Sequence, residues 1–410
     1  MTTVSATPSS LNRAAKTNVL SRAVLGSVTA GSNFAASNAH TYHHLLELGA
    51  DFQAIRIAIP NLEAGAVNGV TAAVAVTASK TSTINPTVGT GLTNDMTSGW
   101  VQATFSSATS VNLPARISAN VPSVTWSDWI PLKSLPRSDS GTYPLLMVRI
   151  THPSGTAAFT YIAANQNINH VALGSKEWLV IRQGVDGVTT PTDFTNTGAT
   201  STMALYAVQA RVNRPSTTIL FVGDSLTEGR PGPGTDGNGW ARRLVDALST
   251  AARPVSGVNH GRSGQSTADF YTRAIARLSD IRPEIAYMSP YSPNDNVSSE
   301  NNLNKMIARA MDFVYQCQLL EIKPVISTCV PSEGTANGAF MTAMDTFVRD
   351  LAAQRNIPML DWRLVLDDDP TAGGGSGLFK SGLKFDAWHP NNAGHQAMAD
   401  HAVPIIRRIL

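Results

Sequence analysis

The sequence predicts an α/β domain with a parallel sheet over residues 214–410, preceded by an all-β domain over residues 45–213. A chain of 410 residues is too long for one ordinary hydrophobic core, so two domains are expected. In the first domain, short apolar runs are separated by turn residues, which is typical of strands. In the second, short apolar runs alternate with helical patterns, which favours a parallel sheet. Residues 1–44 are predicted to form a weakly ordered arm, because they are rich in Ser, Thr and Ala.

The predicted β domain has five main strands. Runs of apolar and β-branched residues mark them at 52–59, 70–77, 143–150, 178–182 and 203–210. Turn-forming pairs such as Pro60-Asn61 and Asp186-Gly187 separate these runs. Many short strands joined by polar turns, with no long amphipathic helix among them, predict a β-sandwich of the jelly-roll kind.

Tryptophans in the β domain suggest a ligand. Trp126 and Trp129 flank Ser127-Asp128 in a predicted connection, and Trp100 and Trp178 lie elsewhere in this charge-poor region. Indole faces beside Asp or Asn side chains are a common way to bind sugars, so carbohydrate binding is one interpretation of this domain. The alternative is that these rings fill the core of the sandwich or the seam between the two domains.

Composition argues against several classes of function. Charged residues make up 15% of the chain and the net charge is +2, so no clustered excess of Lys and Arg predicts nucleic-acid binding. No apolar run approaches the roughly 20 residues that a membrane-spanning helix needs. The two cysteines, Cys317 and Cys329, are expected in the core, because two cysteines cannot form a disulfide framework or a zinc set.

The N-terminal arm leaves the compartment and the assembly open. Arg13, Lys16 and Arg22 precede the first acidic residue, Glu47, and this composition resembles an organelle transit peptide. The other interpretation is an arm that docks to a partner, in a homo-oligomer or a larger assembly. No clear secretory signal is present, and an extracellular or virion-associated protein is compatible with the sequence.

Beyond the linker Arg214-Pro215-Ser216, strands and helices alternate. Apolar runs predict strands at 217–222, 255–259, 285–288, 324–328 and 358–360. Helices are predicted to begin near Trp240, Asp269, Ser299, Gly338 and Asn392, the third with Ser299 as its N-cap. Right-handed crossovers then give a parallel sheet covered by helices on both faces, with ligands bound at the carboxyl ends of the strands.

Ser225 lies where the first of these strands ends, in the stretch FVGDSLTEG (residues 221–229). A serine presented at the end of a rigid core strand suits a nucleophile. The alternative is an ordinary strand-to-loop turn in which the serine caps a helix. Asp224 is expected to form structural hydrogen bonds beneath this turn.

Near the C-terminus, Asp386 and His389 form a candidate acid–base pair. A serine hydroxyl needs a base to accept its proton, most often a His, and a carboxylate holds the other N–H of that His. A spacing of three residues in a tight loop lets the two side chains meet. The alternative is a carboxylate at a helix start and a surface His. Pro390 is expected to stiffen the loop, and Asn391 or Asn392 to cap the closing helix.

Two further loops follow neighbouring strands and are expected beside Ser225. Gly264 lies in the loop after the second strand, and Asn294 lies in the loop after the third. The backbone N–H groups of Ser225 and Gly264 and the side-chain amide of Asn294 are candidate donors to the oxyanion of an acyl transfer. Taken singly, each loop is also compatible with an ordinary polar connection.

Together, these segments resemble the SGNH (GDSL) hydrolase family over about residues 217–410. Ser225 lies in the Gly-Asp-Ser-Leu block, Gly264 and Asn294 match the glycine and the asparagine of the second and third blocks, and Asp386-x-x-His389 matches the last block. All four blocks occur in the family's order.

The resemblance implies a flavodoxin-like three-layer α/β/α fold and a metal-independent ester hydrolase without a cofactor. Ser225, His389 and Asp386 would be its catalytic triad, and Ser225, Gly264 and Asn294 its oxyanion hole. One departure is visible: Ser292 stands where the third block usually has Gly, which affects the expected backbone path of that loop.

Other candidates are set aside. The Gly-rich stretch 230–239 lacks the Gly-Lys-Ser/Thr end of a phosphate loop and is interpreted as a rim of the cleft. His260 and His395 lack the Asp-x-x-His context, and Asp361 is interpreted as a helix or loop carboxylate. No group of His and acidic residues has the spacing of a strong metal-ligand set.

Three functions remain. The favoured one is an O-acetyl esterase that acts on carbohydrate or polysaccharide, because the β domain carries tryptophans and the α/β domain has no long apolar lid segment. The alternative enzyme is a general short-chain esterase, arylesterase or thioesterase. The third is an enzyme-bearing structural component of a virion or a cell surface, suggested by the charge-poor β domain and the arm.

Overall fold

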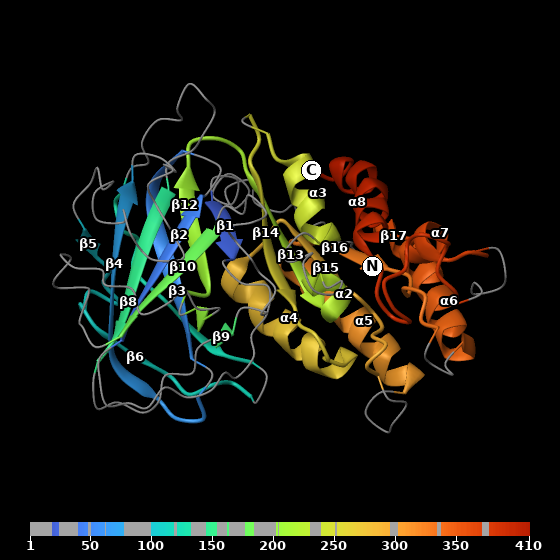
Figure 1. The fold of residues 1–410 in the computed structure, drawn as a ribbon, viewed down its shortest axis with the longest axis horizontal. Coiled ribbons are helices and arrows are strands. Elements are labelled where there is room, and N and C mark those ends of the chain that lie inside the picture. The colour runs from blue at the N-terminus through green and yellow to red at the C-terminus, as the bar shows by residue number, and fades with distance from the viewer. Residues whose placement is uncertain are drawn as a thin grey trace, which may run out of the picture.

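The structure is a computed structural model, in which the described elements of the first part are strands and those of the second part alternate between strands and helices (Figure 1). It describes residues 19–23, 40–47, 51–61, 63–77, 100–118, 121–132, 145–153, 162–163, 177–183, 202–203, 205–229, 239–250, 252–295, 302–333, 338–370 and 377–410. In these ranges no helix is long and apolar enough to cross a membrane.

The N-terminal part contains two antiparallel sheets. The first has the order β1 (Val19–Ala23), β12 (Ala207–Val212), β3 (Phe52–Asn61) and β7 (Ser123–Trp126). The second has the order β10 (Glu177–Gln183), β2 (His40–Glu47), β8 (Leu145–His152), β4 (Val67–Thr77) and β5 (Val101–Gln102), with β6 (Val111–Leu113) also paired to β4. A separate pair joins β9 (Ile162–Ala163) to β11 (Thr202–Met203). The jelly-roll form of this part stays a prediction.

The predicted arm overlaps two of these strands. β1 pairs with β12, and β2 pairs with both β10 and β8. The first strand was not expected, because its apolar run is interrupted by Arg22. The rest of the arm, apart from these strands, lies outside the described residues.

The C-terminal part is built on a five-stranded parallel sheet, as the sequence predicted. Its order is β14 (Val255–Gly261), β13 (Thr217–Gly223), β15 (Ile285–Met288), β16 (Lys323–Ser327) and β17 (Met359–Leu360). β13 lies between β14 and β15, so Phe221 is in register with Asn259 on one side and Tyr287 on the other. The loops after these three strands therefore leave the sheet at the same edge.

Seven helices are found in the described part of this region. They are α2 (Ser225–Glu228), α3 (Trp240–Leu248), α4 (Thr267–Ile281), α5 (Leu303–Leu319), α6 (Gly338–Arg355), α7 (Trp362–Leu366) and α8 (Asn392–Arg407). The prediction that Ser299 caps the third long helix is wrong. α5 begins at Leu303, and the side chain of Asn302 caps it by accepting the backbone N–H of Lys305 at 3.0 Å.

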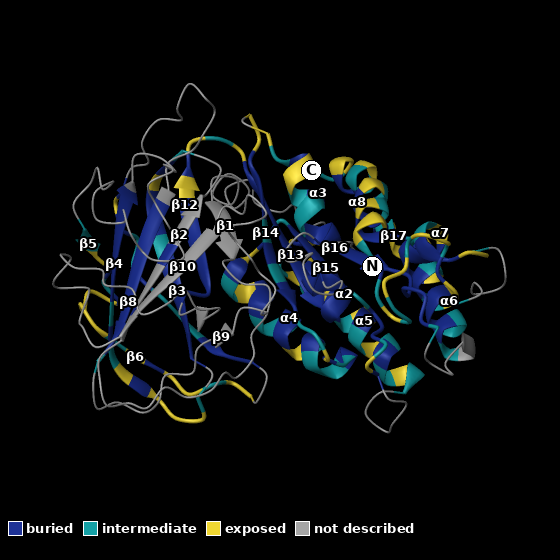
Figure 2. Ribbon diagram, viewed as in Figure 1, coloured by how far each residue is buried: buried dark blue, intermediate teal, exposed yellow. Residues whose placement is uncertain are grey.

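Alternate residues of β13 face two layers of helices. Leu220 and Val222 belong to a core shared with α4, α5 and α6, whereas Ile219 and Phe221 belong to a second core with α3, α7 and α8. The sheet is accordingly buried between helices whose exposed residues face outward (Figure 2). A strand covered on both faces is apolar throughout rather than alternating, which explains why the sequence of β13 is a continuous apolar run.

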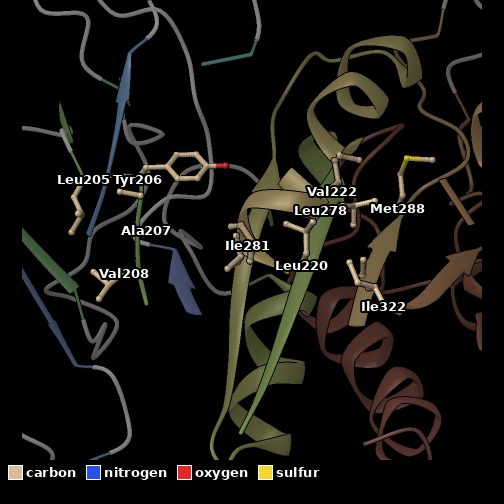
Figure 3. Close-up of a cluster of buried hydrophobic side chains, with 14 of the residues drawn as sticks. Leu205, Tyr206, Ala207, Val208, Leu220, Val222, Leu278, Ile281, Met288 and Ile322 are labelled. Atoms are coloured by element: carbon tan, nitrogen blue, oxygen red, sulfur yellow. The ribbon is translucent and has the colours of Figure 1, made fainter. Parts of the chain in front are cut away.

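The two parts of the chain share a buried junction. Leu205 and Val208 from the first part lie in one core with Leu220 and Ile281 from the second, and the hydroxyl of Tyr206 points toward the second part (Figure 3). At the same junction, Arg277 Nη2 donates to the carbonyl of Pro122 at 2.7 Å, and Gln209 Nε2 donates to the carbonyl of Ile281 at 3.2 Å. The predicted boundary near residue 214 stays a prediction.

A buried ion network supports the segment that leads to the C-terminal loop. Arg363 at the start of α7 donates from Nε to Asp345 at 2.8 Å and from Nη1 to Asp367 at 2.9 Å. All three side chains are almost completely buried. Asp367 also accepts the backbone N–H of Gly377 at 3.0 Å, so the network ties α6 and α7 to the chain that follows.

We expect Arg363→Met to lower the free energy of unfolding by about 3–5 kcal/mol, because it leaves two buried carboxylates without their cation. Denaturant unfolding followed by tryptophan fluorescence measures the change. Arg242→Met is the matched control, since its partner Asp246 is half exposed and exposed ion pairs contribute at most about 1 kcal/mol. Equal losses in the two variants would contradict the structural role of the buried network.

Candidate active site

Ser225 is the first residue of a single helical turn at the end of β13. Asp224 caps this turn: its Oδ1 accepts the backbone N–H of Leu226 at 2.9 Å. Gly229 ends the turn in the left-handed region, with φ of +93°. The predicted structural role of Asp224 is confirmed, and the side chain of Ser225 is held at the carboxyl end of β13.

The structure brings Ser225, His389 and Asp386 into one chain of contacts. Ser225 Oγ lies 2.9 Å from His389 Nε2. On the other side of the imidazole, His389 Nδ1 lies 2.9 Å from each carboxylate oxygen of Asp386. The imidazole therefore bridges the serine hydroxyl and the carboxylate.

The carboxylate fixes the tautomer of the imidazole. Burial raises the pKa of Asp386, but hydrogen bonds from the Trp388 N–H and from His389 outweigh it, so this pKa lies below its usual value. An ionised carboxylate only accepts hydrogen bonds, so Nδ1 of His389 carries the proton and donates it to Asp386. Nε2 is then free to accept a proton from the hydroxyl of Ser225.

Hydrogen bonds from backbone N–H groups hold the loop of Asp386 and His389 in place. The N–H groups of Trp388 and His389 both donate to Asp386 Oδ1 at 2.8 Å, and the N–H of Phe385 donates to the carbonyl of His389 at 2.9 Å. The side chain of Asn391 caps α8 by accepting the N–H of Gly394, as predicted. The loop therefore presents the two side chains in a defined geometry.

The loop of Gly264 packs against the helical turn of Ser225. Glu228 Oε2 accepts the backbone N–H of Ser263 at 2.8 Å. Gly261 approaches this turn so closely that a Cβ there would lie 2.1 Å from the backbone nitrogen of Glu228, which explains the glycine. Gly264 adopts a φ of +75° with open space around it, so its position favours glycine for its backbone conformation.

The loop of Asn294 is connected to both of the others. The Asn294 amide donates to the carbonyl of Gln265 at 3.3 Å and to Ser292 Oγ at 3.1 Å. Ser292 Oγ in turn lies 2.5 Å from Asp224 Oδ2. Below them, Asp295 accepts the backbone N–H of Thr267 at 2.8 Å. Three loops that are far apart in sequence are thus joined by side-chain hydrogen bonds.

Sequence reasoning missed several residues of this arrangement. Ser292 was noted only as a departure from a motif, and Glu228 was not singled out. Arg273 of α4 is buried and donates to the carbonyls of Gly223 and His260, near the ends of β13 and β14, each at 3.2 Å. Ser292 and Glu228 are polar residues close to motif positions, and this is the only sequence signal that could have indicated them.

The histidines that were set aside as bases have structural positions. His260 is buried against the hydroxyl of Tyr206, and burial holds its pKa well below the usual value. His395 is also buried, and its Nδ1 accepts the backbone N–H of Trp240 at 3.3 Å. Asp361 caps α7 and pairs with Arg349, so its interpretation as a helix carboxylate is confirmed. Most of the Gly-rich stretch 230–239 lies outside the described residues.

Arginine side chains cover the tryptophans of the first part. The guanidinium of Arg149 lies 3.8 Å from the ring centre of Trp100, and that of Arg56 lies 4.7 Å from Trp126. Trp129 is contacted by Arg56 and, at 4.3 Å, by Arg211. These cation–π contacts occupy ring faces that a sugar would need. The side chain of Trp178 lies outside the described residues.

Exposed aromatic rings are found instead on the loop of His389. Phe385 is 50% exposed and Trp388 is 41% exposed. Phe385 directly precedes Asp386 and Trp388 directly precedes His389, on a loop whose backbone is held in place. Across the described ranges, no group of three His, Cys, Asp or Glu side chains has an arrangement that would hold a metal ion. Cys317 and Cys329 are buried, as predicted.

Comparisons with known proteins agree on the C-terminal part. The model of the GDSL-like lipase/acylhydrolase family matches residues 221–397. A structure from Desulfitobacterium hafniense DCB-2, provisionally described as a lipolytic protein of the G-D-S-L family, is similar at 24% identity and a TM-score of 0.39, over 46% of this chain and 99% of that one. An acetylxylan esterase from Geobacillus stearothermophilus is similar at 22% identity and a TM-score of 0.37, over 46% and 94%. The esterase EstA from Pseudoalteromonas sp. is similar at 19% identity and a TM-score of 0.37, over 47% and 97%. A comparison with curated proteins found no significant match.

The buried carboxyl of Asp224 predicts a pH dependence of stability. Burial raises its pKa to about 6, above the 3.8 expected in an unfolded chain. Between these pH values the folded state binds more protons than the unfolded state, so this group makes the free energy of unfolding fall as the pH rises from about 4 to about 6. The two pKa values correspond to a fall on the order of 3 kcal/mol.

We expect Asp224→Asn to lack this fall, because the amide does not titrate. Denaturant unfolding of both proteins at intervals between pH 4 and pH 7 gives the difference curve. Asp246→Asn, at a half-exposed position, is the control and should run parallel to the wild type. Parallel curves for Asp224→Asn as well would mean that the Asp224 carboxyl is not perturbed.

Proposed function

We propose that the chain hydrolyses esters through a triad of Ser225, His389 and Asp386, as an enzyme of the GDSL-like lipase/acylhydrolase family, whose model matches residues 221–397. The observation that carries the proposal is the continuous contact chain from Ser225 Oγ through the imidazole to Asp386, with 2.9 Å at each step. This is the separation at which a base accepts the proton of a nucleophilic hydroxyl.

In the first half of the reaction, Ser225 Oγ attacks the carbonyl carbon of the ester. Its proton passes to Nε2 of His389, and Asp386 stabilises the imidazolium that results. When the tetrahedral intermediate collapses, His389 gives the proton to the oxygen of the leaving alcohol. The C–O bond to the alcohol breaks, and the acyl group stays on Ser225.

In the second half, water takes the place of the alcohol. His389 accepts a proton from the water, whose oxygen attacks the acyl carbon. Collapse of the second intermediate returns the proton to Ser225 Oγ and releases the carboxylic acid. Each step uses the same Nε2 atom, so the fixed tautomer of the imidazole serves both halves.

The oxyanion donors are proposed to be the backbone N–H groups of Ser225 and Gly264 and the amide of Asn294. The hydrogen bonds among their loops support this assignment, because donors held in place before the reaction stabilise the developing charge best. The amide of Asn294 donates to the carbonyl of Gln265 and to Ser292 Oγ, and a bound ester would offer it a charged acceptor in the intermediate.

We propose that the substrate is an O-acetyl ester of a carbohydrate. The exposed rings of Phe385 and Trp388 beside the acid–base loop support this choice. The faces of a sugar ring carry C–H groups with partial positive charge, which the negative face of an aromatic ring attracts. The Arg-covered tryptophans of the first part give this choice less support than the sequence suggested.

Two alternatives are kept. A general short-chain esterase, arylesterase or thioesterase would use the same triad without any contribution from sugar rings. A role within a virion or a cell-surface assembly is compatible with either enzyme and concerns the N-terminal arm, most of which lies outside the described residues.

We expect Ser225→Ala to reduce hydrolysis of p-nitrophenyl acetate to the uncatalysed background, and Asp386→Asn to lower kcat by about 10⁴-fold, as in other Ser-His-Asp sites. Steady-state kinetics on the full chain measures both. Ser327→Ala, at a buried serine bonded to Tyr287 at 3.0 Å, is the control and keeps wild-type kinetics. Turnover by Ser225→Ala within tenfold of the wild type would refute the nucleophile.

We expect Phe385→Ala and Trp388→Ala each to lower kcat/KM on acetylated xylo-oligosaccharides more than on ethyl acetate, which has no sugar ring. The ratio of the two values should fall by roughly two- to tenfold per ring. Trp388→Ala keeps the backbone N–H that Asp386 accepts. Tyr315→Ala, at an exposed aromatic residue on α5, is the matched control. An unchanged ratio in both loop variants would favour the general esterase.

A further inference from the structure

We propose that the hydroxyl of Ser292 is a positioning group that locks the turn of Ser225 to the loops of Gly264 and Asn294. The inference rests on the proposed function, because it concerns how the proposed nucleophile and oxyanion donors are held relative to one another. Ser292 is fully buried, it lies two residues before Asn294, and the motif at this position usually has a glycine without any hydroxyl.

The hydrogen-bonding capacity of this hydroxyl is fully used. A serine hydroxyl has one proton to donate and two lone pairs to accept with. The lone pairs face the backbone N–H of Asn294 at 3.2 Å and its side-chain amide at 3.1 Å. The proton faces Asp224 Oδ2 at 2.5 Å and the carbonyl of Gln265 at 3.0 Å. The shorter distance and the negative charge favour Asp224 as the acceptor.

Asp224 connects Ser292 to the helical turn that begins with Ser225. One of its oxygens accepts the N–H of Leu226 and so caps the turn that begins with Ser225, while the other accepts the hydroxyl of Ser292. A single buried carboxylate therefore holds the turn of Ser225 on one side and the loop of Asn294 on the other. Gln265, whose carbonyl accepts from Asn294, follows Gly264 directly and brings in the third loop.

The Ser292 hydroxyl also supports the charge on Asp224. Burial raises the pKa of this carboxyl, and the hydrogen bond from Ser292 is the largest effect that lowers it again. The charged or titratable groups that face Asp224 are His389, whose positive form favours its ionisation, Asp295, which opposes it, and Tyr287. Without the hydroxyl, the buried carboxyl would retain its proton to a higher pH.

The test uses Ser292→Ala and Ser292→Gly in the full chain, with p-nitrophenyl acetate as the substrate. We expect kcat to fall by about 10- to 100-fold with KM within a factor of two, because small displacements of reacting groups cost up to about 10²-fold. Ser327→Ala is the matched control: it removes an equally buried hydroxyl, which lies 3.0 Å from the hydroxyl of Tyr287.

A pH profile separates positioning from a general loss of structure. In Ser292→Ala, the acid limb of kcat/KM should move to higher pH, because the pKa of Asp224 rises when it loses its donor. The double variant Asp224→Asn/Ser292→Ala should have the same acid limb of kcat/KM as the single variant Asp224→Asn. Thermal unfolding of each variant at pH 8 establishes that the protein is folded during the measurement.

The outcomes are distinct for the two proposals. If the wild type hydrolyses no ester, or Ser225→Ala is as active as the wild type, the proposed function fails. If the wild type is active and Ser292→Ala keeps kcat within twofold, the positioning role of Ser292 is overturned. An acid limb that stays in place while kcat falls equally at every pH also overturns it, because a structural defect alone gives that result.

Discussion

The position of Ser225 depends on the burial of β13 on both faces. Every residue of this strand is buried, and β14 and β15 run parallel to it on either side. Because parallel strands end at one edge of a sheet, the loops that follow these three strands meet there. Arg273 supports that edge by donating to the carbonyls of Gly223, the last residue of β13, and of His260, the second-to-last residue of β14. The remaining contacts of the site are built on strand ends that the core has already fixed.

This dependence explains which features could be predicted from the sequence. The strands of the parallel sheet are short and mostly apolar, and the loops after three of them carry Ser225, Gly264 and Asn294, so the meeting of these loops followed from topology alone. The contact between Asp386 and His389 was predictable because the two residues are close in sequence. Contacts between loops were not predictable: the bond from Ser292 to Asp224 depends on the relative heights of two loops, which no local pattern encodes.

The tryptophans of the first part illustrate a second limit. Arg56 and Arg211 lie on the neighbouring strands β3 and β12, and both reach Trp129 only because those strands pair. The sequence alone does not show which strands pair, so it gives no indication that two arginines contact one tryptophan. The junction between the two parts is similar, since the contact of Tyr206 with His260 joins residues that are 54 positions apart. Burial holds the pKa of His260 low, so its imidazole is neutral. His260 lies near the end of β14, just before the loop of Gly264.

Asp386 and His389 lie on one short loop. This affects how their contacts with each other and with Ser225 respond when that loop moves. The carboxylate of Asp386 accepts two backbone N–H groups of its own loop as well as the imidazole N–H. A rigid displacement of the loop would therefore change only the separation of Ser225 Oγ and His389 Nε2, while the tautomer of the imidazole stays set. In a site that takes its acid and base from different strands, the same displacement would disturb both contacts. In the proposed mechanism, thermal fluctuation of this loop would vary the distance between Ser225 Oγ and His389 Nε2, and the imidazole would keep the tautomer that accepts the proton.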